Sequence, residues 1–93
     1  MKAIWKDAVV AESNETILVE GNHYFPLKDV KPEFLSKTET QTTCPWKGKA
    51  HYYSITVDGD TLKDAGWYYP EPKEKAKHIA NYVAFWKGVS VSE

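Results

Sequence analysis

One short loop concentrates reactive side chains within this chain of 93 residues. Thr43 is followed by Cys44-Pro45-Trp46-Lys47-Gly48, so a thiol, an indole ring and a cation lie within four consecutive positions. A thiolate is a nucleophile, and a neighbouring cation stabilises that form. Cys44 with Lys47 is therefore a candidate nucleophile or redox site. The alternative is that Cys44 is a small, buried apolar residue.

Aromatic side chains suggest a second kind of chemistry, the binding of a small molecule. The chain has four Trp and six Tyr, and aromatic walls with a few polar groups are typical of ligand pockets. Four rings are candidates for such a wall: Trp46, Tyr53, Trp67 and Tyr69. The alternative is that these rings form the core. We expect loop 44–48 to form one wall of a concave site, with Glu20, Tyr53 and Trp67 within reach.

Glu20 lies next to a predicted hairpin turn. Two β-prone runs, 17–20 and 23–26, are separated by Gly21-Asn22, and such a pair is typical of a two-residue turn. This register places Glu20 opposite His23 on one face of the hairpin. The two could form an acid/base pair or an exposed ion pair contributing less than ~1 kcal/mol, and we favour the ion pair.

Composition argues against several classes of function. One Cys and three dispersed His cannot supply a closed ligand set, so we expect no metal site, and we expect no cofactor. A net charge of −1 and the absence of Arg argue against nucleic-acid partners. The sequence contains no membrane-spanning apolar run and no secretion signal. We therefore expect a cytoplasmic protein without a membrane partner, either a monomer or a small homo-oligomer.

The elements that must position these residues are mostly short strands. We expect strands at 3–5, 8–11, 49–57, 67–69, 82–86 and 89–91, with a second hairpin turn at Asp58-Gly59. Segment 36–43 is polar and is predicted to be a loop. One helix is predicted over 72–81, because a proline lies near its start and lysines follow glutamates along it. The expected fold is a single α+β domain over residues 1–93, β-rich, with a mostly antiparallel sheet of short hairpins and one clear helix near the C-terminus.

Three motifs together resemble a known family: Glu20-Gly21-Asn22-His23-Tyr24-Phe25-Pro26, Thr43-Cys44-Pro45-Trp46-Lys47-Gly48 and Trp67-Tyr68-Tyr69-Pro70. The family is a bacterial group of small proteins known as domain of unknown function 427. The resemblance implies a compact β-rich domain and implies no activity. A nucleotidyltransferase label is attached to the family, but this chain has no glycine-rich phosphate loop and no closely spaced Asp pair. The chain is also similar to tent-like β folds that bind zinc through paired cysteines, a chemistry that one cysteine excludes.

The family pattern also bears on which residues could matter. The pattern positions present are Glu20, Gly21, Asn22, Tyr24, Pro26, Cys44, Pro45, Trp46, Lys47, Gly48, Tyr53 and Trp67. His23 and His51 occupy variable positions of the pattern, which argues against a histidine-dependent mechanism.

The function that we expect is a small-ligand or interaction module with an aromatic-lined site. Its expected ligand-binding residues are Glu20, Cys44, Trp46, Lys47, Tyr53 and Trp67. One alternative is a small enzyme or redox protein that uses Cys44 as nucleophile, with Lys47 and Glu20 assisting. Another is a structural subunit that buries its aromatic rings in an oligomer. The sequence leaves open whether the protein is an enzyme.

Overall fold

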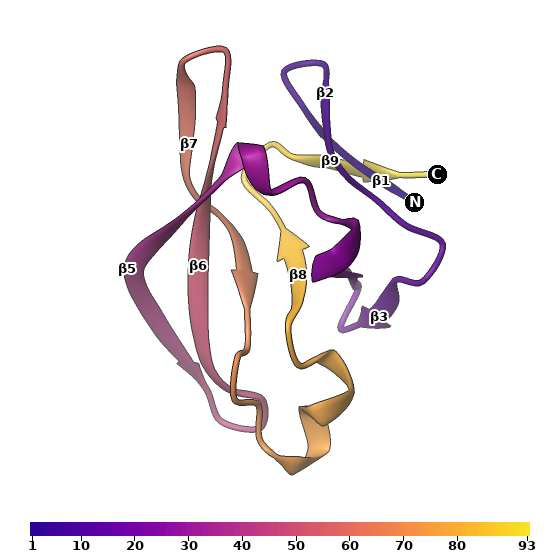
Figure 1. Cartoon of the computed structure of the whole chain (residues 1–93). Coiled ribbons are helices and arrows are strands. Elements are labelled where there is room, and N and C mark those ends of the chain that lie inside the picture. Colours follow the sequence, from indigo (N-terminus) through magenta and orange to yellow (C-terminus); the bar gives the residue numbers. More distant parts are fainter.

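The computed structural model describes residues 1–93, and most of the chain forms antiparallel β-strands (Figure 1). A three-stranded sheet has the order β2-β1-β9, and a six-stranded sheet has the order β3-β4-β8-β7-β6-β5. The strands are β1 (Lys2–Trp5), β2 (Ala8–Glu12), β3 (Ile17–Val19), β4 (Asn22–Pro26), β5 (Leu35–Cys44), β6 (Gly48–Val57), β7 (Asp60–Tyr68), β8 (Tyr82–Phe85) and β9 (Ser90–Ser92).

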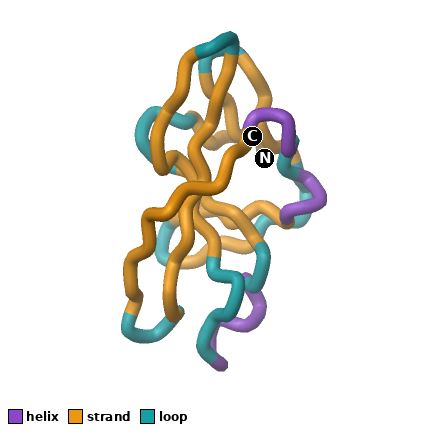
Figure 2. Tube along the Cα trace, turned by 60° about the vertical axis from the view of Figure 1, so that its left-hand side comes forward, coloured by secondary structure: helices purple, strands orange, loops and turns teal.

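The predicted α+β class is wrong, because the clear helix near the C-terminus is absent. Segment 72–81 contains only the 3-10 segment η3 (Glu74–Ile79), and two further 3-10 segments, η1 (Leu27–Asp29) and η2 (Pro32–Phe34), have three residues each (Figure 2). The buried residues of η3 are Ala76 and Ile79. These are three apart, the spacing that shares a face in a 3-10 helix. No helix is long and apolar enough to cross a membrane.

The ends of η3 explain why it stays short. The backbone N–H of Lys73 donates to the Lys47 carbonyl at 2.8 Å, and Ala80 forms an isolated bridge with Tyr69. The chain is thus fixed to the sheet just before and just after the segment. The charge order and the leading proline satisfy the local rules for a helix, but the helix prediction is wrong because these tertiary anchors fix the chain on both sides of a short 3-10 segment.

The predicted loop 36–43 is instead most of β5, an edge strand ten residues long that pairs only with β6. Its sequence is rich in Thr, a β-branched residue that suits strands. Most of its side chains face solvent, so the apolar alternation that identifies a half-buried strand is missing. The edge strand was therefore indistinguishable from a loop by hydrophobic pattern.

Both predicted hairpins are present, and one turns a residue earlier than expected. β3 and β4 pair with Leu18 opposite His23, so Glu20 and Gly21 form the turn, with φ of 53° and 80°. Two positive φ values are typical of a type I′ turn. Glu20 is therefore not opposite His23, and the predicted side-by-side pair does not form. The second turn lies at Asp58-Gly59 as predicted, between Val57 and Asp60.

The core has two parts that lie on opposite faces of the six-stranded sheet. Phe25, Val83 and Tyr53 belong to the larger cluster, which also receives Ala3, Val10 and Ala11 from the small sheet. The neighbours Tyr24 and Ala84 belong to the smaller cluster, with Tyr69, Ala76 and Ile79. Since adjacent strand residues point to opposite faces, β4 and β8 contribute to both clusters at once.

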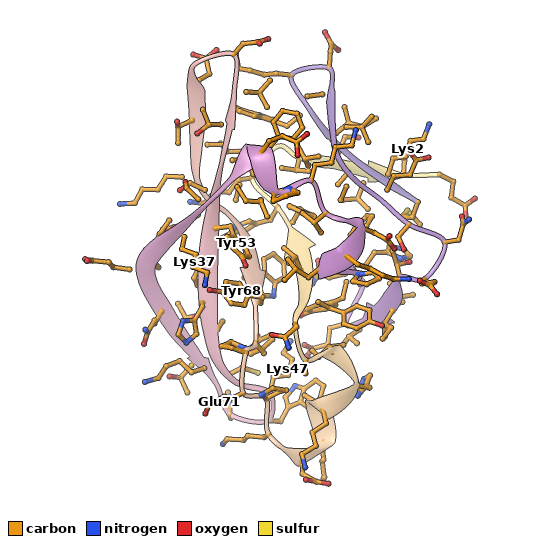
Figure 3. All side chains as sticks on the ribbon, viewed as in Figure 1. Lys2, Lys37, Lys47, Tyr53, Tyr68 and Glu71 are labelled. Carbon is orange, nitrogen blue, oxygen red and sulfur yellow. The ribbon has the colours of Figure 1, made fainter.

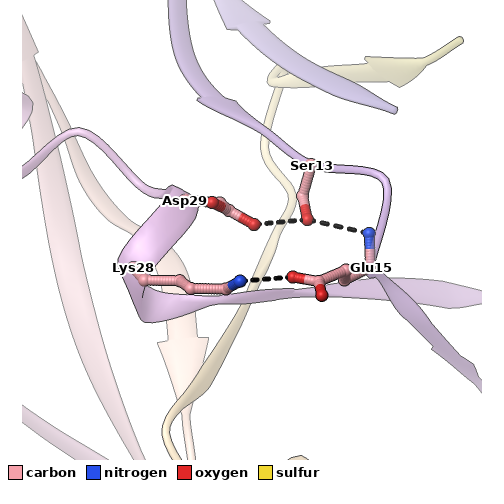
Figure 4. Close-up of polar contacts among 4 residues, drawn as sticks. All are labelled: Ser13, Glu15, Lys28 and Asp29. Atoms are coloured by element: carbon pink, nitrogen blue, oxygen red, sulfur yellow. Dashed lines mark hydrogen bonds and ion pairs between the residues drawn. The ribbon is translucent and has the colours of Figure 1, made fainter.

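A polar cluster joins the end of the small sheet to η1 (Figure 4). The Ser13 hydroxyl donates to an Asp29 carboxylate oxygen at 2.6 Å and accepts the Glu15 backbone N–H at 2.9 Å. Lys28 pairs with Glu15 at 2.5 Å. These bonds fix the path of the chain between β2 and β3.

Candidate functional site

Lys47 is the one charged residue among the buried residues of the chain. It lies in the tight turn between β5 and β6, and only 7% of it is exposed. Its ammonium group forms an ion pair with Glu20, whose side chain is 54% exposed at the tip of the β3–β4 hairpin. The turn and the hairpin tip are 27 residues apart in sequence, so the fold itself creates this pair.

The chain after β7 holds the turn that carries Lys47. The Lys73 ammonium donates to the Pro45 carbonyl at 2.8 Å, in addition to the backbone bond to Lys47. Gly48 has a φ of 116°, and a Cβ there would lie 3.4 Å from the Glu71 carbonyl oxygen. The positive φ therefore favours glycine here, whereas a Cβ would make only ordinary van der Waals contacts with segment 71–73. Figure 3 shows Lys47 and Glu71 near this end of the β5–β6 hairpin.

A hollow of about 210 Å³ lies beside Lys47, and we refer to it as the lysine pocket. It is lined by Lys47, Tyr52, Trp67, Tyr69 and Trp86. The polar tips of three of these rings are bonded to the protein: Trp67 Nε1–H donates to the Tyr24 hydroxyl at 3.1 Å, Trp86 Nε1–H to the Asp64 carbonyl at 2.6 Å, and the Tyr52 hydroxyl pairs with Thr42 at 2.9 Å. These rings therefore offer the pocket mainly their apolar surfaces.

The ion pair and its surroundings shift three pKa values. Burial opposes the charge on Lys47, but the hydrogen bond to Glu20 and the nearby Tyr24 and Tyr69 phenols outweigh it, so the pKa of Lys47 is raised. The hydrogen bond from Lys47 lowers the pKa of Glu20. Burial raises the pKa of Tyr69 to about 12. At neutral pH a charged lysine and a neutral phenol therefore line the pocket, and the lysine is paired with a carboxylate from the hairpin tip.

The structure brings together four of the six residues expected at the site. The Lys47 ammonium lies 5.3 Å from the centre of the Trp46 ring, and Trp46 is itself 36% exposed. Glu20 pairs with Lys47, and Trp67 lines the pocket. Cation–π contacts to Trp46 and, at 5.7 Å, to Tyr69 add to the forces that hold the ammonium group in place.

Two expected residues lie elsewhere. Cys44 is partly buried and packs against the smaller core cluster, outside the lining of the lysine pocket. Tyr53 belongs to the larger cluster and stacks on Tyr68, on the other face of the sheet. His51 also packs against Tyr68, and His23 Nδ1 lies 3.2 Å from the Thr16 hydroxyl, so neither imidazole is a bonded partner of Cys44.

Sequence reasoning missed Tyr52 and Trp86 as pocket residues. Strand periodicity placed Tyr52 and Tyr53 on opposite faces, so only one of them could join Trp67. The cross-strand register decides which, because Tyr52 lies opposite Trp67 and Tyr53 opposite Gly66. No sequence signal fixed that register. No group of three or more His, Cys, Asp or Glu side chains is placed to hold a metal ion.

Comparison with known protein families identifies the family of this chain. Residues 1–92 match the family described as domain of unknown function (DUF427), which confirms the family that the three motifs suggested. No curated protein matches the sequence.

Proposed function

We propose a function from the pocket itself, because the chain belongs to the domain of unknown function (DUF427) family, whose description names no activity. The proposal is that the protein binds a small, neutral, planar molecule in the lysine pocket. The ligand would carry a carbonyl oxygen that accepts hydrogen bonds from Lys47, while its ring contacts the aromatic walls.

The observation that carries this proposal is the unused hydrogen-bonding capacity of Lys47. An ammonium group has three N–H donors, and the one hydrogen bond that the Lys47 ammonium makes within the protein goes to Glu20. A lysine that is only 7% exposed has little access to water. Buried donors without acceptors are costly, so two donors beside a hollow favour an acceptor that arrives with a ligand.

Charge balance favours a neutral ligand. Glu20 already neutralises Lys47, so an anionic ligand would have to displace that carboxylate or repel it. A carbonyl oxygen accepts hydrogen bonds without adding a charge. The Tyr69 hydroxyl is a further neutral donor and acceptor on the same wall.

Size and wall chemistry limit the ligand further. The volume of about 210 Å³ is smaller than that of pockets for drug-sized molecules, which have roughly 300–1,000 Å³. Two indole rings and two phenol rings line the hollow together with the lysine, and flat aromatic surfaces pack well against another flat ring. A single-ring amide fits these limits.

The enzyme alternative has less support. It needs Cys44 next to the bound substrate, and Cys44 does not line the lysine pocket. A raised pKa keeps Lys47 protonated, and a protonated amine is not a nucleophile. We therefore assign Lys47 the role of a hydrogen-bond donor.

Titration with small cyclic and aryl amides tests the proposal. Trp67 and Trp86 line the pocket, so binding of 2-pyridone or benzamide should change tryptophan fluorescence saturably. Lys47→Met should weaken this binding at least about tenfold, the effect of losing one charge-assisted hydrogen bond. Lys75→Met removes an exposed lysine of η3 that has no ion pair, and it is the matched control.

Two results would contradict the proposal. One is the absence of saturable binding by any member of the amide panel, together with no small molecule seen by native mass spectrometry of protein purified from its own host. The other is binding that Lys47→Met leaves unchanged, since the ligand would then not depend on the ammonium group.

A further inference from the structure

The opposite face of the same sheet carries a second aromatic site that the proposed function does not use. On β6, Lys49, His51 and Tyr53 are two residues apart, so their side chains share one face. The register adds Tyr68, opposite His51, and Lys37, opposite Tyr53. Residues from β5, β6 and β7 thus converge on one side of the sheet.

Three of these side chains form a continuous row of rings. Tyr53 and Tyr68 are stacked, with their centres 4.5 Å apart and their planes inclined by 23°. His51 follows, 5.7 Å from Tyr68. Tyr53 is buried, whereas Tyr68 and His51 are half-buried. The two half-buried rings, Tyr68 and His51, therefore keep surface on which a further planar group can pack.

This row faces a cavity of about 330 Å³, which we refer to as the tyrosine cleft. Its lining includes Leu27, Lys37, His51, Tyr53, Tyr68 and Asn81. Figure 3 shows Lys37, Tyr53 and Tyr68 gathered on this part of the sheet, away from Lys47. The volume is within the range of small-molecule sites, and the lining combines apolar and polar groups in the usual way.

The charges of the tyrosine cleft are not balanced. Lys37 has no acidic partner within ion-pair distance, unlike Lys47. A second unpaired cation, Lys49, lies in an adjoining hollow that shares His51 and Pro70 with the cleft. One carboxylate, Glu71, lines that hollow. The side chains around the cleft therefore favour a negatively charged ligand.

We propose that the tyrosine cleft binds a small planar anion, an aromatic ring that carries a carboxylate or phosphate group. The ring packs against Tyr68 and His51, and the anionic group accepts hydrogen bonds from Lys37. Asn81 supplies an amide on the rim for further polar contact. This proposal does not depend on the lysine pocket, because the two sites share no lining residue.

NMR titration of the isotope-labelled full chain tests the proposal. Phenyl phosphate and benzoate are the probes. Inorganic phosphate and phenol, the two halves of phenyl phosphate, are titrated as controls. We expect saturable shifts of the Lys37, His51 and Tyr68 amides with each probe, at a Kd of roughly millimolar order, as befits a fragment. Either half alone should bind at least about fivefold more weakly, because the ring and the anion each contribute.

Variants connect the response to the cleft. Lys37→Gln keeps a polar side chain on an exposed edge strand and should raise the Kd for phenyl phosphate about tenfold. Lys75→Gln is the exposed control and should leave it unchanged, as should Lys47→Met on the other face. The last result separates this proposal from the function proposed for the lysine pocket.

Three outcomes would overturn the proposal. The first is no saturable shift with either probe up to about 20 mM, well above a millimolar Kd. The second is an equal response to inorganic phosphate alone, which would mean that lysines attract any anion. The third is a set of shifts confined to residues around Lys47.

Discussion

The two faces of the six-stranded sheet each carry a lysine beside a hollow, and the two lysines differ in burial and in ion pairing. On one face Lys47 is buried and paired with Glu20 beside the lysine pocket. On the other face Lys37 is exposed and unpaired beside the tyrosine cleft. β6 and β7 contribute aromatic rings to both hollows, and the two hollows differ in the state of their lysine charge.

This difference follows from the cost of burying a charge. A cation removed from water must be paired and hydrogen-bonded, whereas an exposed lysine is stabilised by water and needs no partner. The paired site is neutral as a whole and suits a neutral ligand. The unpaired site is positive and suits an anion. The alternation of strand residues lets Tyr52 and Trp67 line one site while their neighbours Tyr53 and Tyr68 line the other.

The largest expected effect comes from a core substitution, because unfolding of the sheet removes both sites together. Phe25 is fully buried and makes an edge contact with Phe85, with ring centres 5.7 Å apart. Phe25→Ala should destabilise the fold by about 3–5 kcal/mol through lost burial and a new cavity. Urea unfolding measures this, and Leu18→Ala, at a site that is 62% exposed, is the control. Equal unfolding midpoints for the two variants would contradict a stabilising role for the buried Phe25 ring.

Alkaline pH should destabilise the lysine-pocket face through Tyr69. Its pKa is about 12 in the folded protein, whereas its ordinary value, which applies to the unfolded chain, is 10.0. Between these values the unfolded chain releases a proton that the folded chain keeps, so stability falls as pH rises. The total loss from this group is about 2–3 kcal/mol at about 1.4 kcal/mol per pH unit.

Urea unfolding at pH 8 and pH 11.5 measures that loss. Tyr69→Phe should make the decrease shallower. Burial also raises the pKa of Tyr53 on the other face, so Tyr53→Phe should act in the same direction. A decrease that Tyr69→Phe leaves as steep as before would be inconsistent with a buried, neutral phenol at this position.

Substitutions at the buried pair and at the unpaired lysine should differ in their effect on the stability of the fold. Glu20→Gln leaves the buried Lys47 without a counter-ion and should lower the unfolding midpoint at neutral pH. Lys47→Met removes the charge itself and should stay within about 1 kcal/mol of the parent. Lys37→Gln, on the other face, should have no measurable effect on stability. If Glu20→Gln were as stable as the parent, Lys47 would not need its partner.

The smallest effect is expected in acid. Lys47 lowers the pKa of Glu20 below its ordinary 4.5, so the pair stabilises the fold above that value. Its contribution is lost as pH falls through the lower pKa of the folded state. The difference in midpoint between the parent and Glu20→Gln should therefore shrink as pH falls below 4.5 and disappear once pH is below the lowered pKa of the folded state. A difference that persists unchanged at pH 3 would mean that Glu20 acts by packing and not by charge.

Local sequence signals predicted the hairpins but not their tertiary surroundings. Gly21 and Gly59 mark turns because positive φ is chemically specific to few residue types. Segment 72–81 had the charge order of a helix, yet its anchors at Lys73 and Ala80 depend on residues far away in sequence. The edge strand β5 was missed because most of its side chains face solvent. Its sequence therefore lacks the apolar alternation on which strand prediction relies.

The candidate site was predictable in its residue types and not in its geometry. Glu20 and Lys47 were both named from sequence, but nothing in the sequence could show that they pair across 27 positions. Tyr53 was assigned to the wrong face because the choice between Tyr52 and Tyr53 depends on the β6–β7 register. Register is set by pairing across strands, and a pattern within one strand does not contain it.

The most direct test of the two-face comparison observes the lysine ammonium groups themselves. NMR signals of the ¹⁵Nζ groups of Lys47 and Lys37, assigned with Lys47→Met and Lys37→Gln, are followed during two titrations. With 2-pyridone we predict that the Lys47 signal shifts saturably and the Lys37 signal does not. With phenyl phosphate we predict the reverse. If both ligands moved the same lysine, or neither moved Lys47, the assignment of a neutral ligand to the buried pair would be wrong.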